Sequence, residues 1–369
     1  MRRSCGLGVA WVVAVALAAG WPAVAAEAPR KAYDVVTLAP GVHGFVWREP
    51  LADPIEGNSL IVVNDEDVLV VDATLLPSTA RRLAAEVRKL TDKPVRTVVN
   101  THWHDDHQVG NAVFRELWPG ATFVAHRHTR TDAIALSHEK KDEVLAGYRQ
   151  TITTLEGWLE RGVDDAGKGF DEGRRQRAGA MIAMLQQAID ELADLTPVPP
   201  DLTFDDALVL HRGERTIEVR WLGLGNTRGD VVVFLPKERI VATGDLLVHP
   251  VPFAFGSYYR DWIATLGAVD ALGADVLFPG HGPVLGDRAY LHQVQGLLTA
   301  LTDQVAAAVA DDATLDETRA RVTLADWRET FAAGDPGRER AFDAFFLAPA
   351  VERAWRQARG EPDEVKGVD

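Results

Sequence analysis

The sequence predicts an α/β protein of the α+β type, in which short β-strands form sheets that helices interrupt and cover. β-branched runs bounded by turn residues recur from residue 35 to residue 278 of the 369-residue chain. Charged stretches with helical spacing separate two groups of these runs and follow the last of them. Loops that carry His and Asp come directly after several predicted strands, which is where functional sites are usually built.

The first group of strands is predicted at residues 35–38, 44–47, 60–63 and 68–71. The last two runs flank a polar turn and therefore predict a hairpin. Pro77 and Ser78 begin a helix that extends through Leu90. The β-branched run 95–100 then predicts a buried strand, and a further helix leads to a strand at 122–125.

The main domain is expected to span residues 27–286, and residues 129–196 predict a helical insertion within it because they lack strand signals. One apolar stripe recurs there at helical spacing, formed by Met181, Leu185, Ala188 and Leu192. Strands resume as a meander joined by polar turns, at 208–210, 217–220, 231–234 and 240–242, with a last strand at 276–278. Residues 287–369 form a predicted helical extension that either covers the site or makes a dimer contact.

Residues 1–26 have the features of a cleavable signal peptide, with Arg2 and Arg3 before an apolar core and small residues before Glu27. Without them 37 basic and 54 acidic residues remain, a net charge of −17 compared with −15 for the whole chain. This acidity argues against a nucleic-acid substrate. Cys5, the single cysteine, lies in the same segment, so the mature chain is expected to have no disulfide. We expect a periplasmic or secreted protein without a membrane anchor.

The run from His102 to His107 holds three histidines and two aspartates directly after a predicted strand. In an extended or tightly looped segment, residues i and i+2 point to the same side, so His102 and His104 can hold one metal ion. Asp106 and His107 then face a second ion. Imidazole nitrogen and carboxylate oxygen suit zinc, and they suit iron or manganese less selectively. The run therefore predicts a metal centre without naming the metal.

Three later motifs also follow predicted strands: GNTRGD at 225–230, TGDLL at 243–247 and PGHG at 279–282. In this order, together with the HxHxDH run, they resemble the motifs of the metallo-β-lactamase-fold hydrolase superfamily. The resemblance covers about residues 35–286 outside the helical insertion. It implies an αββα sandwich, in which two β-sheets pack face to face with helices outside and metals at one sheet edge.

The resemblance also implies a dinuclear metal centre built from three of these motifs. Its ligand positions are His102 and His104 for the first metal, Asp106, His107 and His281 for the second, and Asp245 as the bridge. A carboxylate can bridge two ions because it has two oxygens. One or two zinc ions per chain are expected, with iron or manganese as alternatives, and a shared hydroxide would be the nucleophile. Asp106 and Asp245 are the expected catalytic residues, and no organic cofactor is expected.

One position departs from the superfamily pattern, because Asn226 stands where a histidine is usual. An amide oxygen is a neutral and rather poor zinc ligand compared with imidazole. Asn226 therefore binds the first metal weakly, supports it through a hydrogen bond or a water, or does not bind it. His249, four residues past Asp245, is either a substitute ligand or an ordinary loop histidine. By the same resemblance, Asp72 is expected to orient a metal ligand.

Substrate contacts are predicted in two loops. Arg228 is a candidate to bind a substrate carboxylate or phosphate in bidentate fashion, with solvation or an ion pair as the alternative. The aromatic stretch 249–259 is expected to shape the pocket, and His249, Phe253 and Tyr258 are its candidate substrate contacts. Trp103 is expected to be a packing residue.

These features predict a secreted metal-dependent hydrolase that acts on an ester, lactone, thioester or related bond of a small molecule. The lactamases resembled here normally place Cys or Ser at the position of Asp245, which argues against a β-lactam substrate. A phosphodiester is a further alternative. Iron-dependent persulfide oxidation is disfavoured because such enzymes rely on the histidine that Asn226 replaces. A periplasmic metal-binding protein without turnover is the non-enzymatic alternative.

Overall fold

The structure is a computed structural model that describes residues 32–48 and 56–361. It combines two β-sheets with many helices, as the sequence predicts. The predicted signal peptide at 1–26 lies outside the described residues. Within the described ranges, no helix is both long enough and apolar enough to span a membrane.

The first sheet contains seven described strands in the order β1-β2-β3-β4-β5-β6-β7, so strands that follow one another in the chain lie side by side. Pairs from β1 to β4 are antiparallel and pairs from β4 to β7 are parallel. The predicted hairpin is confirmed, with Leu60 opposite Val71. The strands are β1 (Tyr33–Ala39), β2 (Val42–Trp47), β3 (Ser59–Val63), β4 (Val68–Val71), β5 (Val95–Val99), β6 (Thr122–His126) and β7 (Leu202–Phe204).

The second sheet contains five described strands in the order β12-β11-β10-β9-β8. The predicted meander is confirmed, because β8 to β11 pair antiparallel in chain order. The last strand joins the opposite side of β11 in parallel. The strands are β8 (Ala207–Arg212), β9 (Arg215–Trp221), β10 (Val231–Leu235), β11 (Ile240–Val248) and β12 (Val276–His281).

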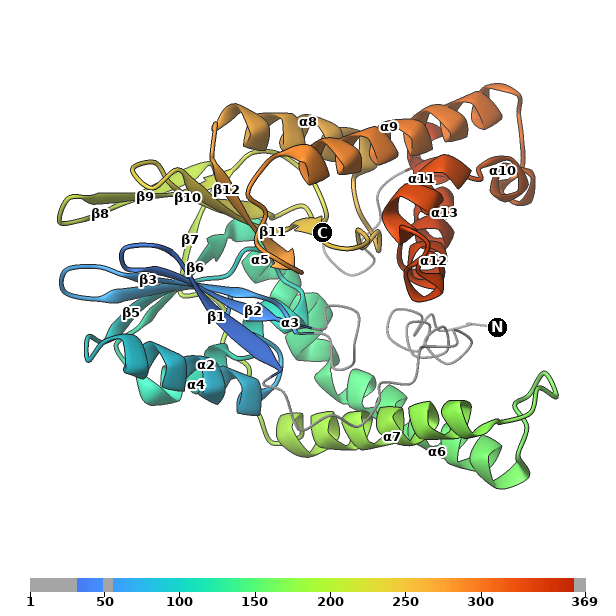
Figure 1. The fold of residues 1–369 in the computed structure, drawn as a ribbon, viewed down its shortest axis with the longest axis horizontal. Helices are drawn as coiled ribbons and strands as arrows, with labels where there is room; N and C mark the ends of the chain where they lie inside the picture. The colour runs from blue at the N-terminus through green and yellow to red at the C-terminus, as the bar shows by residue number, and fades with distance from the viewer. Residues whose placement is uncertain (1–31, 49–55, 362–369) are drawn as a thin grey trace.

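The two sheets pack face to face with helices on both outer sides, which confirms the predicted αββα sandwich (Figure 1). Leu69 and Val71 of the first sheet meet Val231 and Val233 of the second in one buried apolar cluster. α2 (Pro77–Leu90) and α4 (Asn111–Leu117) cover the outer face of the first sheet, and α8 (Tyr259–Ala271) and α9 (Ala289–Ala310) cover the second. Burial of these apolar faces, at about 25 cal/mol per Å², is what holds the layers together.

The segment predicted as an insertion is helical in the structure. It contains α5 (Arg127–Asp132), a π-helical turn (Ala133–Ser137), a 3₁₀ turn (His138–Lys140), α6 (Lys141–Arg161) and α7 (Glu172–Leu192). Figure 1 shows α6 and α7 lying side by side as an arm that extends from the sandwich. The predicted apolar stripe is buried, with Met181 and Leu185 packed against α6 and Ala188 and Leu192 packed at the base of the arm.

The C-terminal region is helical, as predicted, and it shares the core of the second sheet. Its elements after α9 are α10 (Leu315–Arg321), α11 (Ala325–Ala332), α12 (Pro336–Ala341), a π-helical segment (Phe342–Leu347) and α13 (Ala348–Ala358). Phe342 and Phe346 are fully buried in the same apolar cluster as Trp262 of α8. The backbone N–H of Ala254 donates to the carbonyl of Phe345 at 2.9 Å. These contacts tie the loop after β11 to the C-terminal helices.

Three motif segments are more regular than the sequence indicates. Asp245, predicted in a loop after a strand, lies inside β11, and His281 ends β12 rather than following it. The parallel pairing of β11 with β12 continues past Gly244 with register shifts, and that pairing is a long-range feature with no local signal. Asp106 and His107, also predicted in a loop, lie in the one-turn helix α3 (Asp105–Gln108). Asp105 and Asp106 stabilise the N-terminus of this helix, because negative charge is favoured at the positive end of the helix dipole.

Candidate metal centre

The six predicted ligand residues come together at one edge of the sandwich. His102 and His104 lie between β5 and α3, Asp106 and His107 lie in α3, and Asp245 and His281 come from the adjacent strands β11 and β12. The two sheets are joined here, because the N–H of Val231 donates to the carbonyl of Thr101 at 2.9 Å.

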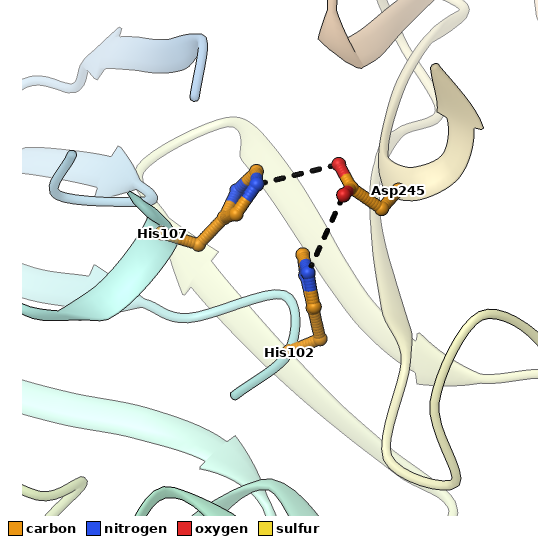
Figure 2. Close-up of side chains that lie close together, drawn as sticks. All are labelled: His102, His107 and Asp245. Atoms are coloured by element: carbon orange, nitrogen blue, oxygen red, sulfur yellow. Dashed lines mark ion pairs between the residues drawn. The ribbon is translucent and has the colours of Figure 1, made fainter. Parts of the chain in front are cut away.

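Asp245 directs one carboxylate oxygen at His102 and the other at His107, as Figure 2 shows. One carboxylate oxygen, Oδ2, lies 3.6 Å from His102 Nε2. The other, Oδ1, lies 3.3 Å from His107 Nε2 and 3.4 Å from His281 Nε2. Each oxygen therefore faces a different set of nitrogen lone pairs, which is the arrangement that a bridging carboxylate requires.

A second group of ligand atoms surrounds the Oδ1 side of Asp245. Asp106 Oδ2 lies 3.0 Å from His281 Nε2 and 3.3 Å from His107 Nε2. The two Nε2 atoms of His107 and His281 lie 3.2 Å apart. Asp106, His107 and His281 form one candidate metal-holding group, and His102, His107 and Asp245 form another. The ring of His104 is centred 4.5 Å from that of His102.

Outer residues fix the orientation of these ligands. Asp72 Oδ2 lies 2.9 Å from His107 Nδ1, and the same carboxylate accepts hydrogen bonds from the backbone N–H and hydroxyl of Thr101. His107 therefore presents Nε2 to the centre. On β12, Gly280 is required because a Cβ there would lie 2.1 Å from Asp245 Oδ1. Asn58 holds this turn by donating to the carbonyls of Pro279 and Gly282.

Burial and charge set opposite protonation tendencies within the cluster. Burial lowers the pKa of His102 well below its usual value, which leaves that ring neutral with a lone pair for a metal. Burial also opposes a charge on His107, but the carboxylates of Asp106, Asp245 and Asp72 raise its pKa well above the usual value. The pKa of Asp106 is lowered despite its burial, chiefly by the charge on His107. Asp106 is therefore ionised, and a metal ion would take the place of the proton that the surrounding carboxylates attract to His107.

The residues present fit a divalent metal. Among the described residues, buried atoms without a hydrogen-bond partner include His102 Nε2, Asp245 Oδ1 and Asn226 Oδ1. Leaving a buried polar group unsatisfied costs about 1–3 kcal/mol, so these atoms call for partners. A cation would suit them, since all three atoms offer lone pairs, and His102 and Asp245 belong to one group that could hold a metal ion. Imidazole and carboxylate ligands suit zinc, and the added oxygens also suit iron or manganese.

Asn226 occupies the loop between β9 and β10 and is 1 % exposed. Its Nδ2 atom donates to the carbonyl of Phe253 at 2.9 Å, with the hydroxyl of Ser257 at 3.4 Å. The amide nitrogen is thereby occupied, and Oδ1 is buried without a hydrogen-bond partner. An unpartnered amide oxygen is compatible with Asn226 as a weak direct ligand.

A cavity of about 170 Å³ opens beside His104 and Asn226. Tyr258 lines it, as does Trp103, which the sequence predicted to be a packing residue. Arg228 also lines the cavity, but its Nε and Nη2 atoms both donate to the carboxylate of Asp132, with Nε 2.9 Å from Oδ2. The ion-pair alternative for Arg228 is therefore the one observed, and its charge anchors α5 to the GNTRGD loop.

Two predicted substrate contacts lie elsewhere. The ring of His249 packs against Tyr290, with centroids 4.9 Å apart, and burial lowers the pKa of His249 to about 4. His249 is not among the residues that line the cavity, and it belongs to neither candidate metal group. Phe253 packs between His281 and Phe345, at 5.9 and 5.0 Å, and contributes its carbonyl to Asn226 rather than its ring to the cavity. The sequence signalled an aromatic loop, but not which rings turn inward.

Three contributors to the site were missed in the sequence. Glu56 is fully buried, accepts the N–H groups of Leu75 and Leu76, and has a pKa raised to about 8 by burial. Asp132 and Arg353 line the cavity from the insertion and from the C-terminal helix α13. None of the three carries a local motif, so only their place in the fold identifies them.

Comparison with known proteins gives one family and several relatives. The sequence profile described as the Metallo-beta-lactamase superfamily matches residues 52–281. The linear primary-alkylsulfatase of Pseudomonas sp. (strain ATCC 19151) is 28 % identical over 243 residues, which are 62 % of this chain and 42 % of that protein. The chain thus spans less than half the length of this relative.

Solved structures share the fold at low identity. A metallo-beta-lactamase family protein from Thermus thermophilus superposes with a TM-score of 0.55 at 19 % identity, over 88 % of this chain and 95 % of that one. A metallo-beta-lactamase from Pontibacter korlensis gives a TM-score of 0.51 at 19 % identity, over 72 % and 99 % of the two chains. The relatives named include a sulfatase and a β-lactamase, which are hydrolytic enzymes. As its motifs predict, the chain belongs to the metallo-beta-lactamase superfamily.

Proposed function

We propose that this chain is a metal-dependent hydrolase that cleaves an ester, lactone, thioester or related bond of a small molecule. The observation that carries the proposal is the position of Asp245, whose two oxygens face His102 on one side and His107 and His281 on the other. Superfamily membership supports the same activity. We propose zinc as the metal, at one or two ions per chain, because nitrogen donors dominate the ligand set.

Asp106, His107, Asp245 and His281 would hold one ion, and His102, His104, Asp245 and the weaker Asn226 would hold the other. Divalent ions held there supply hydroxide near neutral pH and polarise the bond to be cleaved, which is chemistry that these side chains lack on their own. Asp72 keeps His107 oriented, at 2.9 Å from its Nδ1. Trp103 and Tyr258 form aromatic walls of the cavity beside His104.

A sulfate ester is a second candidate substrate. The alkylsulfatase similarity favours it, since that relative is named for a linear alkyl sulfate. The cavity also has the two parts that such a molecule needs, because Trp103, Leu136 and Phe255 are apolar and Arg353 is cationic. β-Lactams and phosphodiesters belong in the same screen as the alternatives that the fold admits.

We also propose that the chain acts in the periplasm or outside the cell, on a small molecule rather than on nucleic acid. The basic and apolar start of the sequence and the acidic remainder support this proposal. Fractionation of cells that express the whole chain, followed by N-terminal sequencing of the mature protein, tests it. A cytoplasmic protein that retains residues 1–26 would refute it.

The test of the activity combines metal analysis with a substrate screen. Protein purified without chelator is expected to contain one or two zinc ions per chain and to cleave at least one member of an ester, lactone, thioester, alkyl sulfate, phosphodiester and β-lactam panel. Removal of metal should abolish that cleavage and addition of zinc should restore it. Protein that holds metal tightly and cleaves none of these bonds would instead favour a non-catalytic metal-binding role.

A further inference from the structure

The cavity beside the metal centre includes a residue from far along the chain. We propose that Arg353 of α13 recognises an anionic group of the substrate in this cavity, next to His104 and Asn226. The proposal rests on the hydrolase function proposed above and narrows its substrate to an ester with a negative charge and an apolar body. Arg353 lies outside the family match at residues 52–281.

The fold holds the Arg353 guanidinium against the cavity wall. Its Nε donates to the carbonyl of Ser257 at 3.3 Å, and its Cζ lies 5.3 Å from the centroid of the Tyr258 ring. Tyr258 lines the same cavity and is 8 % exposed. A hydrogen bond on one nitrogen and an aromatic face beside the group reduce the rotamer freedom that a substrate would otherwise have to remove.

The loop that carries these contacts is itself fixed by the C-terminal helices. Gln357, one turn after Arg353 on α13, donates to the same Ser257 carbonyl at 3.0 Å. The N–H of Ala254 donates to the carbonyl of Phe345 at 2.9 Å. The loop in turn holds Asn226 through the Phe253 carbonyl. Arg353 and the candidate ligand Asn226 are therefore positioned by one continuous set of hydrogen bonds.

The charges around the cavity favour an anion. Among the described residues that line it, Asp132 is the sole carboxylate, and Arg228 binds it with two nitrogens. Asp132 is 2 % exposed and Arg228 is 20 % exposed at their side chains, so this pair is largely removed from water. Metal ions held by the histidines would add positive charge to the same space. A guanidinium offers five donors in a planar fork that matches sulfate, phosphate or carboxylate oxygens.

The remaining walls indicate the rest of the substrate. Trp103, Leu136 and Phe255 line the cavity with apolar surface, and its volume of about 170 Å³ suits a small group rather than a polymer. An ester whose anionic end contacts Arg353 would leave its apolar body against these side chains.

Binding of an uncleavable anion tests the proposal separately from turnover. The probe is octane-1-sulfonate, and octyl methyl sulfone is its neutral counterpart with the same chain. Isothermal titration of the mature protein, with its metal as purified, compares the wild type with Arg353→Met and Arg353→Lys. Arg356→Met is the matched control, because Arg356 lies on the same helix but is exposed and pairs with Glu352.

We expect Arg353→Met to weaken sulfonate binding about tenfold or more, as loss of a charge-assisted hydrogen bond does, and to leave sulfone binding within about twofold. The sulfonate affinity of Arg353→Lys should lie between those of the wild type and Arg353→Met, because lysine keeps the charge but lacks the planar fork of donors. The Lys variant also serves if the Met variant fails to fold. Arg356→Met should match the wild type. With a cleaved anionic ester, Arg353→Met should raise KM more than it lowers kcat.

Equal weakening of the sulfonate and the sulfone would mean that Arg353 only packs the cavity, and it would overturn the proposal. Unchanged sulfonate binding in both Arg353 variants would do the same. Wild-type protein that cleaves neutral esters but binds no sulfonate would reject the anion site and leave the hydrolase function standing. Sulfonate binding that depends on Arg353 in a protein without turnover would support the anion site and reject the hydrolase.

Discussion

His107 receives its orientation from Asp72, whose Oδ2 lies 2.9 Å from His107 Nδ1 while the other side of the ring faces Asp245. Asp72 closes β4 in a left-handed backbone conformation, with φ of 61°, which carries its carboxylate to the end of the neighbouring strand β5. The ends of β4 and β5 therefore together fix the position of His107 Nδ1. Such outer contacts set the direction and basicity of a metal-binding imidazole.

Asp72→Asn should lower metal affinity at the Asp106, His107 and His281 group by about 10–100-fold, because the amide no longer offers two anionic oxygens. Asparagine tolerates φ above zero, so the backbone should remain in place. Competition with a zinc chelator measures the affinity. Asp67→Asn is the control, since Asp67 is similarly buried but binds Arg212 and Asn64 in the turn between β3 and β4. Equal affinities in wild type and Asp72→Asn would contradict the orienting role.

Asp245→Ala should remove binding of two ions and reduce hydrolysis more than about 100-fold, which is the upper end of the effect expected for an outer contact. The reason is that both of its oxygens face nitrogen ligands, at 3.3 and 3.6 Å. Metal content by mass spectrometry and steady-state rates check this prediction. A variant with two ions and the wild-type rate would show that Asp245 is not the bridge.

Asn226→His should tighten metal binding on the His102 and His104 side, because imidazole is a better zinc ligand than an amide oxygen. Asn226→Ala should weaken it by about tenfold. Cobalt substitution provides the readout, since the visible spectrum of cobalt reports the number and type of its ligands. If the alanine and histidine variants both retain the wild-type spectrum, the Oδ1 atom of Asn226 makes no contact with metal.

His126→Phe should make the protein less sensitive to acid. His126 is 3 % exposed, its ring stacks on Trp221, and its Nδ1 accepts the N–H of His128. Burial, with the nearby His128, lowers the pKa of His126 from 6.5 to about 4. Because the folded pKa is depressed, its contribution to stability is present above pH 6.5 and is lost as the pH falls towards 4.

That loss should be on the order of 2 kcal/mol for the wild type. Phenylalanine keeps the stacking and has no proton to gain, so the difference in Tm between pH 7 and pH 5 should shrink. Thermal unfolding at both values measures it. His211→Phe, at an exposed position of β8, is the control and should leave the wild-type pH dependence unchanged. The same acid sensitivity in the His126 variant would disprove the assignment.

Much of the fold could be predicted because its signals are local. The hairpin between β3 and β4 follows from two apolar runs around a polar turn, and α2 begins at Pro77, where a missing N–H costs nothing. The meander from β8 to β11 was visible for the same reason. The length of β11 could not be predicted from the sequence. Its second half is held by parallel pairing with β12, a strand that follows α8, and the register of this pairing shifts twice.

The candidate site divides in the same way. Four of the candidate ligands could be predicted because they lie within six consecutive residues, where residue type and spacing are both visible: His102, His104, Asp106 and His107. The hydrogen bond from the Asn226 amide could not be predicted, because its acceptor, the Phe253 carbonyl, lies in another loop. Arg228 was predicted either to contact substrate or to form an ion pair, and the structure shows the ion pair with Asp132, 96 residues away.

The sequence alone determined which groups are available for metal chemistry and which family they belong to, because ligand identity and motif order are properties of the chain itself. Only the tertiary structure decided that the two oxygens of Asp245 face different imidazoles and that Arg353 lines the cavity beside His104. Those relationships depend on the packing of two sheets and the C-terminal helices. They are long-range, and burial of apolar surface between distant segments, rather than any local preference, fixes them.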